Sequence, residues 1–74
     1  MRGMTSAERL LADIEAFLSE TGTTASAFGR AAASDPNFVG DLRGGRKPNL
    51  DLADRVWNFI ETRRAELKQQ GEAA

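Results

Sequence analysis

The side chains that most often carry out catalysis are scarce in this sequence. It has no histidine and no cysteine, so the commonest general base, the commonest metal ligand and the reactive thiolate are all absent. Two carboxylate pairs, Asp51/Asp54 and Glu61/Glu66, suggest acid chemistry or cation binding. However, Asp51 and Asp54 fall in the first turns of an expected helix, where acidic side chains are stabilising without any further role. We therefore expect no enzymatic activity, no catalytic residue, no cofactor and no metal ion, and we expect the protein to act by binding.

Basic side chains are concentrated in the middle of the chain. The whole protein has a net charge of -1, and segments 1–22 and 51–74 are each net negative. Residues 23–50 are net positive because four bases outnumber two acids: Arg30, Arg43, Arg46 and Lys47 against Asp35 and Asp41. Any electrostatic attraction to phosphate must therefore come from this middle segment.

Length and composition predict a single small domain. A chain of 74 residues is too short for two ordinary domains, and 41% apolar with 28% charged residues is typical of a globular chain. No apolar run approaches the roughly 20 residues of a membrane span, and residues 1–6 lack the apolar stretch of a secretory signal. We expect one domain over residues 1–68, a frayed polar tail over 69–74 and a cytoplasmic location.

Apolar spacing and capping residues predict helices and no strand. The first helix begins after Thr5, which can form a capping box with Glu8, and it ends at Gly22. Its expected buried stripe is formed by Leu10, Leu11, Ile14, Phe17 and Leu18. The charged side chains expected on the opposite, solvated side are Arg9, Asp13, Glu15 and Glu20.

A second, shorter helix is expected over residues 25–33, capped by Thr24. Phe28, Ala31 and Ala32 are its natural inward positions. Gly29 costs about 1 kcal/mol relative to alanine inside a helix, so we expect another helix to pack closely against it. The alternative is that the helix simply tolerates glycine at this position, with no close neighbour.

The third expected helix, residues 36–43, has barely two turns. Asp35 is its expected N-cap and Pro36 its first residue, where the missing N–H of proline is harmless. Phe38, Val39 and Leu42 are spaced for burial, and Gly44-Gly45 ends the helix. So short a helix is marginal in isolation, so we expect packing to hold it and its outer face to be used.

A fourth, long helix follows the basic loop 46–48 and is capped by Asn49. The residues expected on its buried side are Leu50, Ala53, Val56, Trp57, Ile60 and Leu67. Trp57 is interpreted as a core residue or a dimer contact rather than a ligand-binding residue. Arg63 and Arg64 are interpreted as a solvated face.

Two helices joined by a turn of three or four residues form a helix-turn-helix arrangement. Over about residues 22–60 the sequence resembles the lambda-repressor-like (XRE) family of DNA-binding domains. The matching residues are Thr24, Phe28 and Gly29 in the second helix, Val39 and Leu42 in the recognition helix, and Gly45, Pro48 and Asn49 after it. Three features depart from the family: Ala33 or Ser34 replaces the usual glycine of the turn, the loop before Pro48 is one residue short, and Arg43 replaces a usual glutamate. The resemblance implies a compact all-α domain of four to five helices with its motif at about residues 24–43.

The resemblance also implies that residues 36–43 lie in the major groove of double-stranded DNA. The residues expected to contact bases are Asn37, Gly40, Asp41 and Arg43, and those expected to contact phosphates are Thr24, Ser26, Arg30, Arg46 and Lys47. Asn37 is suited to a paired contact with adenine, and its alternative is a turn residue. Gly40 either allows close backbone approach to DNA or has no role. For Asp41 we expect one of three roles: to accept from a cytosine amine, to orient Arg43, or to be solvated. Arg43 is expected to read guanine or to contact a phosphate. The alternative for Arg46 and Lys47 is that they belong to a solvated loop.

These residues predict a nucleoid-associated, sequence-specific transcriptional regulator. A domain of this size normally needs a second copy or a partner transcription protein for useful affinity; we expect a homodimer to use Trp57, Phe59 or Leu67 of the fourth helix. We expect no membrane partner and no small-molecule ligand. The alternative is a protein-interaction adaptor, or an antagonist of another regulator, that does not bind DNA. The sequence pI of 5.3, Gly40 and Asp41 favour that alternative.

Overall fold

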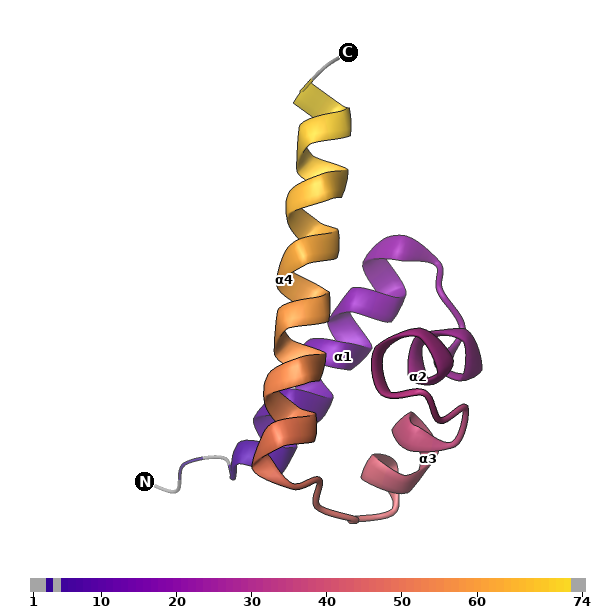
Figure 1. Ribbon diagram of the computed structural model, residues 1–74, viewed down its shortest axis with the longest axis vertical. Helices are drawn as coiled ribbons and strands as arrows, with labels where there is room; N and C mark the ends of the chain where they lie inside the picture. Colours follow the sequence, from indigo (N-terminus) through magenta and orange to yellow (C-terminus); the bar gives the residue numbers. More distant parts are fainter. Residues whose placement is uncertain (1–2, 4, 73–74) are drawn as a thin grey trace.

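The computed structural model describes the backbone of residues 3 and 5–72 and the side chains as far as Lys68. Within this part of the chain it contains helices and no strand, which confirms the expected all-α class. The helices are α1 (Ser6–Thr21), α2 (Ala25–Ala33), α3 (Phe38–Arg43) and α4 (Leu50–Glu72). In Figure 1, α2 and α3 lie on one side of α4, α1 crosses behind α4, and the upper part of α4 extends beyond the other helices.

The two ends of α1 are set by local hydrogen bonds, as the sequence predicts. The Thr5 hydroxyl accepts from the backbone N–H of Glu8 at 3.1 Å, and the Glu8 carboxylate accepts from the backbone N–H of Thr5 at 2.8 Å. Gly22 adopts the left-handed conformation at φ 71°, and its N–H donates to the Leu18 carbonyl. The capping box and the glycine stop are therefore confirmed.

The junction of α2 and α3 differs from the prediction at the start of α3. The Asp35 carboxylate accepts from the backbone N–H of Asn37 at 2.9 Å, and the Asp35 carbonyl accepts from the N–H of Phe38 at 3.1 Å. These bonds form a turn over residues 35–38, so the α-helix begins at Phe38 rather than at Pro36. Asp35 therefore closes a turn instead of capping a helix, because its side chain bonds the residue two positions on.

Gly29 is buried where the turn returns against α2. A Cβ at this position would lie too close to the carbonyl oxygen of Asp35 and 3.4 Å from the Cβ of Phe38. The N–H of Asp35 also donates to the Gly29 carbonyl at 3.0 Å. The expected close packing is present: the nearest atom belongs to the backbone of the turn, and Phe38, the first residue of α3, is also close.

The helix α4 begins as expected and continues further than expected. The Asn49 side-chain oxygen accepts from the N–H of Leu52 at 2.8 Å, as an N-cap should.

Two side chains of α4 that were predicted to be buried are exposed, Leu50 at 81% and Leu67 at 47%. Leu50 is the first residue of the helix, and Leu52 packs against the core in its place. Leu67 lines an open groove together with residues of α1 and α2, which leave it partly exposed. The backbone is helical as far as Glu72, where a frayed tail was expected, and residues 73–74 lie outside the described part.

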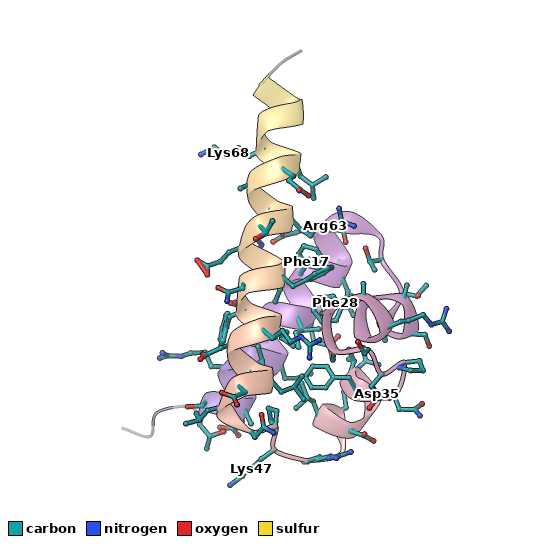
Figure 2. All side chains as sticks on the ribbon, in the orientation of Figure 1. Phe17, Phe28, Asp35, Lys47, Arg63 and Lys68 are labelled. Atoms are coloured by element: carbon teal, nitrogen blue, oxygen red, sulfur yellow. The ribbon has the colours of Figure 1, made fainter. Side chains whose placement is uncertain are left out.

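One hydrophobic core joins the four helices. Its buried side chains are Leu10, Ile14, Phe17, Phe28, Ala32, Phe38, Val39, Leu42, Val56 and Ile60. Phe17 and Phe28 meet between the helices, with ring centroids 5.6 Å apart, and the Phe59 ring lies 5.5 Å from that of Phe28 (Figure 2). Ala31 was expected to face inward but is exposed, because Phe28, Gly29 and Ala32 occupy the inward side of α2.

No helix in the described residues is both long enough and apolar enough to cross a membrane.

Candidate nucleic-acid interface

The outer face of α3 is exposed and carries little side-chain bulk. Phe38, Val39 and Leu42 point into the core, so the opposite side of the helix presents Asn37, Gly40 and the adjoining Gly44, all of which are exposed. These three residues follow one another at three- and four-residue spacing, which places them on one face. A Cβ at Gly40 would meet nothing within 4 Å. This outer face of α3 therefore allows another molecule to approach the helix backbone closely.

Asn37 stands at the N-terminal end of this face. Its backbone carbonyl accepts from the N–H of Asp41 at 2.9 Å, which joins it to the helix. Its side chain makes no capping hydrogen bond, because Asp35 provides the bond that closes the turn. The amide of Asn37 is therefore left to interact with a ligand as donor and acceptor.

One edge of the outer face carries the Asp41–Arg46 ion pair. A guanidinium nitrogen of Arg46, Nη1, lies 2.9 Å from the Asp41 carboxylate, and the Arg46 backbone N–H donates to the Asp41 carbonyl at 3.0 Å. Asp41 therefore holds the beginning of the basic loop against α3. One role expected for Asp41 was to orient Arg43. In the structure Asp41 pairs with Arg46 instead, and Arg43 pairs with Glu15.

The other edge carries the Arg43–Glu15 ion pair, which joins α3 to α1. Arg43 donates from Nε to one carboxylate oxygen of Glu15 at 2.7 Å and from Nη2 to the other at 2.8 Å. The hydrogen bond from Arg43 lowers the pKa of the Glu15 carboxyl below its usual value, and the pKa of Arg43 is raised in turn. Both groups are therefore charged at neutral pH, and the Arg43 guanidinium is directed toward Glu15 at the edge of the face.

The phosphate-contact candidates of α2 lie at its N-terminus and on its exposed side. The Thr24 hydroxyl oxygen accepts from the N–H of Ala27 at 3.1 Å, which leaves its own O–H as a donor. Ser26 and Arg30 are exposed one turn apart, so they share a side of the helix. No carboxylate in the described part of the chain lies within ion-pair distance of Arg30.

Lys47 lies on the loop between α3 and α4, and its side chain points away from the body of the molecule (Figure 2). A cavity of about 250 Å³ lies beside this loop and includes Asp35, Asp41, Arg46, Lys47 and Asn49 in its lining. The mixture of charges in the cavity favours no single class of ligand. For Lys47, as for Arg30, the described residues provide no ion-pair partner.

The structure brings together only some of the residues singled out in the sequence. Asn37, Gly40, Asp41 and Arg46 gather on or beside the outer face of α3, whereas the guanidinium of Arg43 points toward α1. Glu15 was assigned to the solvated side of the first helix, and its role beside α3 was missed. No signal in the sequence reveals it, because the two residues are separated by 28 positions and by the whole of α2.

The residues that the structure describes contain no cluster of three or more carboxylates that could hold a metal ion. None of their buried side-chain polar atoms lacks a hydrogen-bond partner. The chemistry of the outer face of α3 is therefore that of hydrogen bonds and charge on an exposed surface. Comparisons of the chain with protein-family models, with curated proteins and with solved structures found no match.

Proposed function

We propose that the protein is a sequence-specific, double-stranded DNA-binding transcriptional regulator of the lambda-repressor-like kind. The observation that carries the proposal is the exposed outer face of α3, which presents the Asn37 amide and two glycines and has a guanidinium group at each edge. The helix is held against α2 and α1 by buried side chains, so its outer face is free to enter a groove. A helix supported in this way is suited to the major groove of B-form DNA.

Sequence reading in this proposal depends mainly on Asn37. An asparagine amide can pair with the N6 and N7 positions of adenine, which discriminates against other bases by about 1 to 3 kcal/mol. Gly40 and Gly44 let the helix backbone come close to the base edges. Asp41 contributes by holding Arg46 at the edge, where a free donor of its guanidinium can contact a guanine.

Phosphate contacts in this proposal come from both sides of α3. Thr24 and Ser26 donate from their hydroxyls near the N-terminus of α2, where the helix dipole also favours an anion. Arg30 and Lys47 contribute positive charge that no nearby carboxylate of the described chain neutralises. Since one small module buries only about 600–1,000 Å² of its surface on DNA, tight binding requires a second copy or a partner transcription protein.

The experiment that tests the proposal is selection of bound duplexes from random sequence, followed by fluorescence-anisotropy titrations at several salt concentrations. We expect Lys47→Ala and Arg30→Ala each to weaken binding to all duplexes and to reduce the slope of log K against log salt by about 0.9. We expect Asn37→Ala to reduce the preference for the selected sequence by about 10-fold while non-specific affinity changes little. Lys68→Ala is the control, because Lys68 lies far from Lys47 along the molecule (Figure 2).

A second candidate function is that of an adaptor that binds another regulator and not DNA. The pairing of Arg43 and Arg46 with carboxylates favours it, because each pair is neutral overall. An adaptor would leave every duplex unbound, or would bind duplexes with no dependence on salt. Either result would replace the DNA-binding proposal with this one.

A further inference from the structure

Two carboxylates stand beside the cations that flank the outer face of α3. Glu15 engages Arg43 through two hydrogen bonds of 2.7 and 2.8 Å, and Asp41 engages Arg46 at 2.9 Å. Glu15 and Asp41 come from different helices, so two separate parts of the fold place an anion against a cation of the same surface. This repetition is not a requirement of the core, since both pairs lie outside it.

All four charged side chains reach solvent. The exposed fractions are 49% for Arg43 and 43% for Glu15, and they are 72% for Arg46 and 38% for Asp41. A phosphate that approaches either guanidinium therefore also approaches a carboxylate, and it meets a pair whose net charge is zero. Ion pairs this exposed contribute little to stability, so their main physical effect is on the charge that the surface offers to a ligand.

Resting on the DNA-binding function proposed above, we propose that Glu15 and Asp41 are specificity-determining residues. They neutralise two of the four cations of residues 23–50, and so they limit attraction to the DNA backbone that is independent of sequence. Non-specific affinity depends on the number of phosphates that are neutralised by protein cations. Because Arg43 and Arg46 are paired, non-specific affinity for phosphates comes from Arg30 and Lys47. The Asn37 contact with a base then accounts for a larger share of the total binding free energy.

Glu15 has a second effect on Arg43, because it determines which donors stay available. The carboxylate occupies Nε and Nη2 of the guanidinium, while Nη1 takes no part in the pair. A ligand at the outer face of α3 therefore meets Arg43 in one orientation. Loss of the Glu15 charge would free the side chain to follow any nearby phosphate.

The test measures binding to a random-sequence duplex and to the selected duplex as a function of salt for Glu15→Gln, Asp41→Asn and the double variant. We expect each single substitution to steepen the slope of log K against log salt by about 0.9 and to raise non-specific affinity about five- to ten-fold at 0.1 M salt. The ratio of specific to non-specific affinity should fall in both variants. Glu20→Gln is the matched control, because Glu20 pairs with Arg64 at 3.3 Å on α4 and its loss changes the net charge equally.

A further variant separates local neutralisation from general charge effects. In Glu15→Gln/Arg43→Gln the cation is removed together with its carboxylate partner, so the slope should return to the wild-type value. If Glu15→Gln and Asp41→Asn give the slope of Glu20→Gln, the specificity role is overturned while DNA binding by the wild-type protein stands. If the wild-type protein binds no duplex in a salt-dependent way, it is the proposed function that fails. Circular dichroism of each variant verifies that it is folded, and Asp41→Asn tests the idea independently if Glu15→Gln does not fold.

Discussion

Gly29 is the residue on which the contact between α2 and the following turn depends. Its N-terminal neighbour Phe28 is fully buried, and its own Cα faces the Asp35 carbonyl so closely that a Cβ would not fit. The obstructing atom belongs to the backbone, which is also tied to Gly29 by the 3.0 Å bond from the Asp35 N–H. A side chain at position 29 could be accommodated only by moving α3, because the turn leads directly into that helix.

We expect Gly29→Ala to lower the free energy of unfolding by about 1 to 3 kcal/mol, the usual cost of overpacking a filled site. Gly40→Ala is the matched control, since a Cβ there would meet nothing within 4 Å, and the better helix propensity of alanine should raise stability by up to about 1 kcal/mol. Urea unfolding followed by circular dichroism measures both changes. Equal effects of the two substitutions would contradict the close approach at Gly29.

At the scale of elements, the placement of α3 against α2 depends on the connecting segment, residues 34–37. Ser34 has φ 56°, a left-handed conformation that suits glycine better than serine. The turn is nevertheless closed by the Asp35 side chain and by the backbone bond to Gly29. These local hydrogen bonds therefore maintain a backbone conformation that Ser34 itself disfavours.

We expect Ser34→Gly to stabilise the protein by about 0.5 to 1 kcal/mol, because relief of the left-handed strain exceeds the extra entropy of glycine in the unfolded chain. Ser26→Gly is the comparison, since Ser26 is exposed within α2 and glycine there should cost about 0.5 kcal/mol. Thermal and urea unfolding of the two variants measure the difference. A loss of stability in both would mean that the strain at Ser34 is energetically unimportant.

At the scale of the whole molecule, an open groove lies between α1, α2 and α4. The groove has a volume of about 420 Å³, and the apolar residues in its lining are Phe17, Ala27, Phe28, Ala31, Phe59 and Leu67. The side chains of Arg63 and Glu66 also line it and form a 3.3 Å ion pair. Trp57 and Phe59 are half-buried and pack against the core, so of the three residues expected at a dimer contact Leu67 is the most exposed.

If the proposed homodimer forms, we expect it to use this groove, with Leu67 at its centre. Leu67→Glu should then weaken self-association at least 10-fold, because a carboxylate would be buried against the aromatic rings. Leu50→Glu is the control, since Leu50 is 81% exposed at the other end of α4. Sedimentation equilibrium over a range of concentrations, with and without duplex, measures the effect. If the wild-type protein stays monomeric both with and without duplex, the proposed homodimer is contradicted.

The helices and much of the core could be predicted from the sequence because their causes are local. The caps formed by Thr5, Thr24 and Asn49 each act on an N–H three residues away, and all three are present as expected. The exposure of Leu50 and the start of α3 at Phe38 were not predictable in this way. Periodicity assigns a residue to a face, but whether another element reaches that face depends on the packing of the helices.

The sequence by itself determined the order of the helices, the caps formed by Thr5, Thr24 and Asn49, and that positive charge gathers in the middle of the chain, since each of these depends on residues close together in the chain. Only the tertiary structure decided that Glu15 neutralises Arg43 and that the backbone of Asp35 requires a glycine at position 29. The Glu15–Arg43 pair depends on how α1 and α3 cross, and that geometry is set by the whole core rather than by any short run of residues.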